Sequence, residues 1–233
     1  MSSFDYVKEQ LAVVRESVSA AAAKSGRKSS EVKLLAVSKT FPAEAVMAAY
    51  EAGQRLFGEN KVQELEIKVP VLPQDIEWHL IGHLQGNKAQ KAVSSASFIH
   101  SVDSVKLLQR IDRIAGENFL KPEILLEFNV SGEESKFGAS LEKDAMTLAG
   151  EAVKCKNIEF TGLMTMAPLD ADEKVLRTVF SSLRELENSI ENEFGIKLPE
   201  LSMGMSGDYA IAIEEGSTIV RIGTAIFGKR DYH

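Results

Sequence analysis

The chain has little of what marks a secreted, membrane or nucleic-acid-binding protein. Its 233 residues include one cysteine, Cys155, which excludes an intramolecular disulfide and suits a reducing, cytoplasmic location. No apolar run is long enough to cross a bilayer, so we expect no membrane association. The formal net charge is −7, opposite in sign to a surface that binds nucleic acid, so we expect no nucleic-acid partner.

The sequence also lacks a break that would divide it. It has no Pro/Ser-rich linker and no low-complexity tract, so residues 1–233 are expected to form a single domain. Residues 1–30 have no uninterrupted apolar core of the kind found in signal peptides. Instead, Val7, Leu11, Val14 and Val18 recur at helical spacing. They predict an N-terminal helical extension that packs on the rest of the chain.

Short apolar runs then alternate with helical segments. The runs that read as strands are residues 32–38, 55–58, 77–81, 97–101, 123–129, 159–164, 200–203 and 218–222. This alternation predicts an α/β fold of parallel strands joined by helices, and eight strands in about 200 residues favour a (β/α)₈ (TIM) barrel. An open doubly wound sheet is the competing architecture. It would favour a glycine-rich turn after the first strand, where this chain has VSKTFP.

Lys39 ends the first predicted strand, where a buried ammonium without a partner is costly. A desolvated lysine in a barrel mouth can attack a carbonyl to form a Schiff base, either with a substrate or with pyridoxal phosphate. The alternative is a loop lysine at the surface, paired with Glu59 or a similar carboxylate. The spacing of the residues does not by itself separate these two interpretations.

The turns after the last two predicted strands contain small and hydroxyl-bearing residues. Ser206 and Gly207 follow the seventh strand, and Gly223 and Thr224 follow the eighth. Glycines let the backbone approach a phosphate closely, and backbone N–H groups can bind the anion. Each turn alone is also compatible with an ordinary glycine-containing loop. Together with Lys39 they predict a site for an aldehyde that carries a phosphate.

Arg221 lies two residues before Gly223, so both point to the same side of the predicted strand. An arginine directed into a barrel needs an acceptor. One candidate is the pyridine nitrogen of pyridoxal phosphate, which would stay unprotonated because a guanidinium does not give up its proton. The alternative is a structural ion pair with a carboxylate of another strand, such as Glu127.

Six segments carry a resemblance to a known family: AVSKT, FGENKVQE, WHLIGHLQGNK, SGEESKFG, GLMTMAP and LSMGMSGDYAIAIEEGSTIVRIGTAIFG. Over residues 32–228 the chain resembles the pyridoxal phosphate homeostasis proteins, the YggS/PROSC family, which are alanine-racemase N-terminal-domain-like. The resemblance implies a fold-type III barrel that binds pyridoxal 5′-phosphate (PLP) as an aldimine. It also implies a role in intracellular PLP homeostasis, in which the protein holds, buffers or delivers the cofactor without an established catalytic activity.

The resemblance assigns the site residue by residue. It implies a PLP site made of the aldimine lysine Lys39, the pyridine partner Arg221, the phosphate-binding Ser206, Gly207, Gly223 and Thr224, and the ring-lining Asn60, His83, Met164 and Met203. Lys136, in the loop after the fifth predicted strand, is a candidate relay for the aldehyde during release. An exposed loop lysine is the simpler interpretation of Lys136.

The leading alternative function is a PLP-dependent amino-acid racemase with weak activity. That reaction needs acid or base groups on both faces of the substrate Cα. Racemases of this fold take a tyrosine from a second domain, which we do not expect here, and Tyr209 is the only tyrosine near the predicted site. We therefore expect a cofactor-binding protein rather than an enzyme, a monomer whose candidate partners besides PLP are apo PLP-dependent enzymes.

Two further interpretations are weaker. His79 and His83 have the i, i+4 spacing of a metal-binding helix, but their segment reads as a strand followed by a loop, so no metal site is expected. A barrel that serves only as a scaffold for protein partners would leave Lys39 and the two phosphate-type turns unexplained.

Overall fold

The strands close into a barrel in which each strand pairs in parallel with the next along the chain and β8 pairs with β1. The computed structural model describes residues 4–133, 137–141 and 144–229, and within them it has eight barrel strands. The strands are β1 (Lys33–Val37), β2 (Leu56–Glu59), β3 (Glu77–Leu80), β4 (Phe98–Val102), β5 (Glu123–Glu127), β6 (Glu159–Met164), β7 (Glu200–Met205) and β8 (Ile219–Ile222). The predicted (β/α)₈ barrel is confirmed, and the open sheet is excluded.

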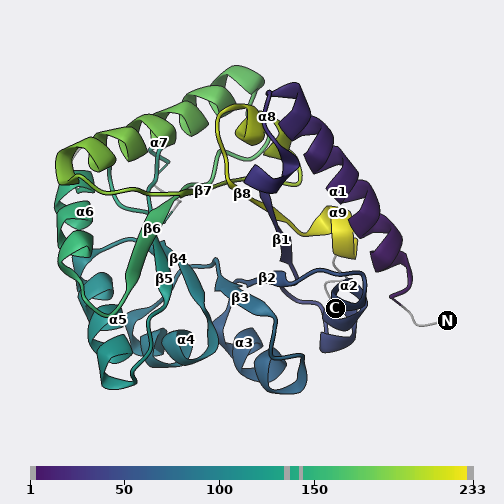
Figure 1. Ribbon diagram of the computed structural model, residues 1–233, viewed down its shortest axis with the longest axis horizontal. Coiled ribbons are helices and arrows are strands. Elements are labelled where there is room, and N and C mark those ends of the chain that lie inside the picture. Colours follow the sequence, from purple (N-terminus) through teal and green to yellow (C-terminus); the bar gives the residue numbers. More distant parts are fainter. Residues whose placement is uncertain (1–3, 134–136, 142–143, 230–233) are drawn as a thin grey trace.

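The helices lie outside the barrel and connect its strands (Figure 1). They are α1 (Tyr6–Lys24), α2 (Ala43–Glu51), α3 (Val62–Lys68), α4 (Ala89–Ser95), α5 (Val105–Glu117), α6 (Ala145–Lys154), α7 (Glu173–Phe194), α8 (Tyr209–Glu214) and α9 (Thr224–Phe227), with 3₁₀ turns at Ser29–Glu31, Val69–Val71 and Gly86–Lys88. Parallel neighbours require such crossover connections. Among the described helices, none combines the length and apolar character needed to span a bilayer.

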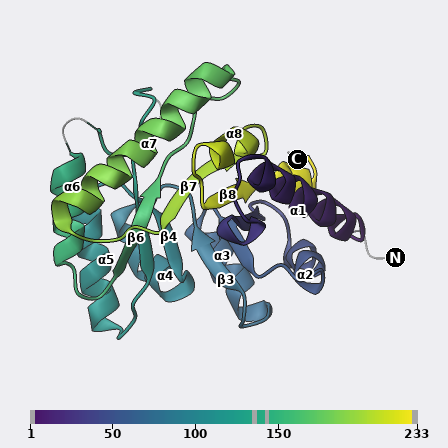
Figure 2. The ribbon, with the colours of Figure 1, turned by 45° about the horizontal axis from the view of Figure 1, so that its top comes forward.

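The expected N-terminal helix, α1, packs on the outside of the barrel against α8 and α9 and beside α2 (Figures 1 and 2). Its buried side chains are Val7, Leu11, Val14, Val18 and Ala22. The Tyr6 hydroxyl donates a hydrogen bond of 2.7 Å to the carbonyl of Phe227 in α9. The helix therefore covers the part of the barrel where the first and last strands meet.

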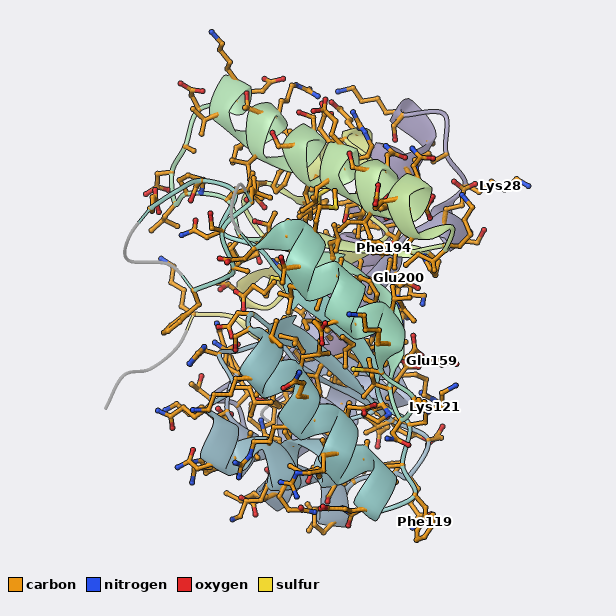
Figure 3. All side chains as sticks on the ribbon, turned by 90° about the vertical axis from the view of Figure 1, so that its left-hand side faces the viewer. Lys28, Phe119, Lys121, Glu159, Phe194 and Glu200 are labelled. Carbon is orange, nitrogen blue, oxygen red and sulfur yellow. The ribbon has the colours of Figure 1, made fainter. Side chains whose placement is uncertain are left out.

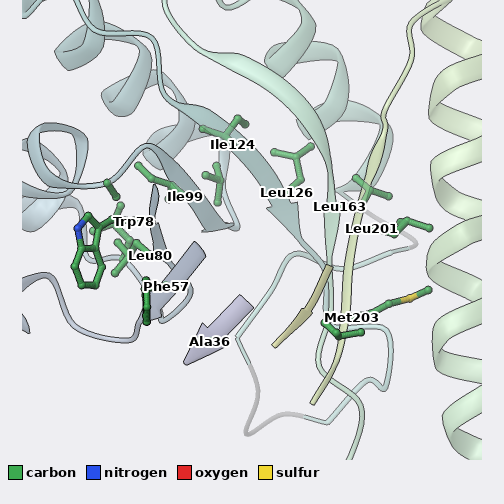
Figure 4. Close-up of a cluster of buried hydrophobic side chains, with 14 of the residues drawn as sticks. Ala36, Phe57, Trp78, Leu80, Ile99, Ile124, Leu126, Leu163, Leu201 and Met203 are labelled. Atoms are coloured by element: carbon green, nitrogen blue, oxygen red, sulfur yellow. The ribbon is translucent and has the colours of Figure 1, made fainter. Parts of the chain in front are cut away.

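Apolar side chains cover both faces of the barrel wall, as expected for parallel strands that are buried on both sides. Phe57, Leu80, Ile99, Leu126 and Met203 belong to the cluster between the strands and the helices (Figure 4). A second cluster fills the inside of the barrel and consists of Leu35, Val37, Ile81, Phe98, Leu125, Met164 and Ile219.

The two ends of the barrel differ in chemistry. In the side view of Figure 3, Lys121, Glu159 and Glu200 lie along one edge; Glu159 and Glu200 begin β6 and β7, so this edge is the amino-terminal end. Lys121 pairs there with Glu159 at 3.1 Å, and Lys33, the first residue of β1, pairs with Glu200. The predicted site residues follow the opposite, carboxyl-terminal ends of the strands, where (β/α)₈ barrels carry their functional groups.

Candidate functional site

A cavity of about 550 Å³ lies at the carboxyl-terminal end of the barrel, within the usual size range of small-molecule sites. The predicted site residues that line it are Lys39, Asn60, His83, Ser206, Gly207, Arg221, Gly223 and Thr224. They follow or end β1, β2, β3, β7 and β8, so the closed barrel brings together residues from both ends of the chain.

The two predicted methionines, Met164 and Met203, are not among the residues that line this cavity. Met203 faces outward in the cluster under the helices, whereas Met164 lies in the inner cluster below the cavity. Met166 and Met205, each two residues further along, line the cavity instead. In β7 the pairing with β8 shifts register between Ser202 and Met205, so simple alternation from Met203 does not give the inward residues.

Lys39 lies in the turn after β1, half-buried and in the wall of the cavity. Its strand pairs with β8 in such a register that Leu35 lies beside Arg221. Lys39 is thus four residues beyond the level of Arg221, and the two cations occupy different heights on adjacent strands. Glu59, the carboxylate suggested as a partner for Lys39, accepts hydrogen bonds from Lys68 Nζ at 2.6 Å and Ser38 Oγ at 2.7 Å.

Arg221 is only 3% exposed, and burial lowers the pKa of its guanidinium to about 10, which leaves it charged at neutral pH. Its Nη1 donates to Ser202 Oγ at 2.6 Å, and its Nη2 donates to the carbonyl of Thr165 at 2.8 Å. These bonds replace the suggested ion pair with Glu127. They orient the guanidinium and use two of its five N–H donors.

A chain of buried side chains continues from Arg221 through the barrel. Ser202 Oγ lies 3.0 Å from His100 Nδ1, His100 Nε2 lies 2.8 Å from His79 Nδ1, and His79 Nε2 lies 3.0 Å from Glu77 Oε1. Since Ser202 accepts from Arg221, its own hydrogen can go to His100, and each histidine can then donate from Nε2. Burial lowers the pKa of both histidines, which favours these neutral forms.

The turns after β7 and β8 border the same cavity. Asp208 Oδ1 accepts the backbone N–H of Met205 at 2.5 Å and so closes the turn that contains Ser206 and Gly207. A Cβ added to Gly207 would meet no atom within 4 Å, so this part of the turn faces open space. Ser206, Gly207, Gly223 and Thr224 all line the cavity, so the two turns border one common space.

The histidines that suggested a metal site diverge. His79 lies inside the barrel, whereas His83 lines the cavity, where its Nδ1 is 3.3 Å from Asp103 Oδ2 and its ring stacks on Phe137 with centroids 4.0 Å apart. The described residues contain no group of three or more His, Cys, Asp or Glu side chains that could hold a metal ion.

Sequence reasoning missed Glu127 as a member of the cavity wall. This last residue of β5 is 2% exposed, and its Oε2 has no hydrogen-bond partner among the described residues. Burial raises the pKa of its carboxyl to about 7. The alternation of β5 offered a signal, because Glu127 is two residues from the inward-facing Leu125. Lys136, the suggested relay, lies outside the described residues.

Comparison with known proteins gives a consistent result over almost the whole chain. The sequence profile of the family described as alanine racemase, N-terminal domain, matches residues 10–231. A pyridoxal phosphate homeostasis protein of Aquifex aeolicus is 41% identical over 225 residues, which cover 96% of this chain and 98% of that protein.

Solved structures agree with the sequence comparison. The structure of PipY from Synechococcus elongatus PCC7942 with PLP bound has a TM-score of 0.83 and 38% identity, covering 95% of this chain and all of that one. The alanine racemase of Streptomyces coelicolor has a TM-score of 0.75 at 20% identity and covers 94% of this chain but 59% of the racemase. This second likeness concerns the fold alone.

Proposed function

Because the chain belongs to the family of pyridoxal phosphate homeostasis proteins, built on the alanine racemase N-terminal domain, we propose that it binds PLP and serves PLP homeostasis in the cell. The observation that carries the proposal is the pairing of β1 with β8, which directs Lys39 and Arg221 toward one cavity beside the turn at Gly207. The PLP bound to the PipY relative supports the choice of ligand.

In this proposal Lys39 holds the aldehyde of the cofactor through an imine bond, and Arg221 faces the pyridine nitrogen. Ser206, Gly207 and Thr224 surround the phosphate. A cofactor whose pyridine is held by a guanidinium is a weak electron sink, which suits storage and delivery better than bond cleavage at an amino acid. The reversibility of an imine allows an amine or water to release the cofactor.

We further propose that the chain is not an enzyme. Its homeostasis relatives are not named as enzymes. Tyr209, the tyrosine that a racemase reaction would recruit, is at the start of α8 and is not among the residues of the cavity wall. Following the chirality of single L-amino acids during incubation with the PLP-loaded protein tests the racemase alternative, and no racemisation is expected.

The central experiment is an absorption spectrum of the protein after incubation with PLP. We expect an imine band at the violet edge of the visible range that is absent from Lys39→Ala and unchanged in Cys155→Ala. Borohydride reduction followed by peptide mass analysis should locate the cofactor on Lys39. A band that survives Lys39→Ala, or no band in the wild type, would contradict the proposal.

The delivery role has its own experiment. PLP-loaded protein is mixed with an apo PLP-dependent enzyme in the presence of an agent that traps free cofactor. We expect the enzyme to gain activity despite the trap. Activation that the trap abolishes would indicate release into solution, which is buffering without direct transfer.

A further inference from the structure

The turn that carries Lys39 is held by a buried polar cluster from β2 and α3. Lys68, the last residue of α3, has a side chain that is 5% exposed. Its Nζ donates to the carbonyl of Ser38 at 3.0 Å, to Glu59 Oε1 at 2.6 Å and to Glu64 Oε2 at 3.3 Å. These acceptors match the three donors of an ammonium group. One of them is backbone of the residue directly before Lys39.

The residue directly after Lys39 is bound to the same cluster. The backbone N–H of Thr40 donates to Glu64 Oε2 at 2.7 Å, and Thr40 has a φ of +70°. For a β-branched residue this left-handed conformation is strained, and it persists only where the surroundings hold it. The hydrogen bond from the Thr40 N–H to Glu64 fixes this conformation.

The cluster is poorly explained as a device for stability. A buried ion pair loses much of its attraction to desolvation, and well-packed apolar side chains often replace such pairs without loss. Glu59 Oε2 has no partner among the described residues, and burial raises the pKa of Glu59 to about 7. The cluster does, however, fix the backbone on both sides of a single residue, Lys39.

We propose that Glu59, Glu64 and Lys68 are positioning residues that clamp the turn of residues 38–40 and so aim the Lys39 side chain into the cavity. The inference rests on the proposed function, in which Lys39 holds the PLP aldehyde. The clamp fixes the backbone before cofactor arrives, so less ordering is needed when the lysine reacts. A misaligned amine loses much of the rate and affinity that orientation provides.

The test compares variants of the full-length protein that differ in one feature of the clamp. Glu64→Ala removes the acceptor of the Thr40 N–H, whereas Glu64→Gln keeps an oxygen there. The double variant Glu59→Gln/Lys68→Met removes the ion pair between the two most buried members of the cluster and leaves only Glu64 charged, at the partly exposed edge. Lys33→Met is the matched control, because it breaks a lysine–glutamate pair at the other end of the same strand.

Three quantities are measured: the PLP concentration for half-maximal imine absorbance, the exchange rate of the Thr40 amide hydrogen without PLP, and the midpoint of thermal unfolding. For Glu64→Ala and the double variant we expect the half-saturating PLP concentration to rise about tenfold or more. Thr40 exchange should accelerate in Glu64→Ala by a similar factor. Glu64→Gln and Lys33→Met should bind PLP as the wild type does, whatever their thermal midpoints.

The outcomes separate the two proposals. If the wild type forms a Lys39-linked product and Glu64→Ala binds PLP equally well, the clamp is wrong and the proposed function stands. If the wild type forms no such product, the proposed function fails and the clamp falls with it. Should the double variant not fold, the comparison of Glu64→Ala with Glu64→Gln decides, because Glu64 lies at the partly exposed edge of the cluster.

Discussion

Glu127 is a buried carboxyl group whose Oε2 has no hydrogen-bond partner among the described residues, and this gives it a measurable effect on stability. Its pKa rises from an ordinary 4.5 to about 7, first because of burial and then because Asp103 lies nearby, while Arg221 opposes the shift. Between these two pKa values the folded chain holds a proton that the unfolded chain has released. The contribution of Glu127 to stability should therefore fall as pH rises from about 5 to 7.

Glu127→Gln removes this titration. Between pH 5 and pH 8 the unfolding free energy of the variant, relative to the wild type, should rise by up to about 3 kcal/mol. Urea unfolding at several pH values measures the difference. Glu59 and Glu187, whose pKa values burial also raises to about 7, titrate in both proteins and cancel. A difference that does not change with pH would contradict the assignment.

Two buried serines on the barrel wall make a matched pair. Ser202 accepts from Arg221 and lies against His100, whereas Ser101 Oγ has no hydrogen-bond partner in the described part of the chain. Ser202→Ala should lower the unfolding free energy by about 2 kcal/mol or more because it leaves two buried groups unsatisfied, whereas Ser101→Ala should cost less than about 1 kcal/mol. Urea unfolding measures both free energies. Equal losses in the two variants would show that the hydrogen bonds from Arg221 through Ser202 to His100 add nothing to stability.

For single residues, the sequence predicts which side chains line the cavity from their positions after predicted strands. This prediction is unreliable where a strand has an irregular register. Lys39 and Gly207 follow strand ends and line the cavity. Met203 does not, because it follows the inward-facing Ser202, and the register shift that comes next in β7 brings Met205 to the cavity instead. The pairing of His79 with His100 depends on neighbouring strands in three dimensions, and no local pattern encodes it.

Among the elements, the end of strand β7 depends on one glycine. Gly204 has a φ of +93°, and a Cβ added there would lie 2.6 Å from the Ala212 Cβ and 3.0 Å from the Tyr209 Cα. The glycine lets α8 approach the strand and lets the chain turn Met205 toward the cavity.

Gly204→Ala and Gly207→Ala should therefore behave differently. Gly204→Ala should lower the unfolding free energy by at least about 1–2 kcal/mol from the backbone conformation alone, with the clash in addition. Gly207→Ala should fold as stably as the wild type but bind PLP more weakly, because its methyl group enters the space proposed for the phosphate. Thermal unfolding and PLP titration measure the two effects; the reverse pattern would contradict this role of the turn.

The elements themselves were well predicted from sequence, for a physical reason. Strands buried on both faces are short apolar runs, and β1 ends in three buried apolar residues, Leu35, Ala36 and Val37. The positions of buried residues in α1 follow from their spacing. What spacing did not reveal is the clamp between α3 and the turn after β1, since Lys68 reads from the sequence as an ordinary lysine near a helix end.

For the whole molecule, the alternation of apolar runs with helical segments predicts a closed barrel. The pairing of β8 with β1 confirms this closure. The single domain, the monomeric state and the cytoplasmic location stay predictions. So does the role of each site residue, because gathering around a cavity is a necessary condition for binding but not a sufficient one.

The packed interior below the cavity has a kinetic consequence for the proposed carrier. Phe98, Leu125 and Met164 belong to the apolar cluster inside the barrel, and the residues that line the cavity come from the carboxyl-terminal end of the barrel. We therefore expect PLP to enter and leave the cavity through the same opening, at the carboxyl-terminal end of the barrel. A recipient enzyme docked over this opening would block rebinding of PLP until it dissociated. Each docking event would then deliver at most one PLP molecule.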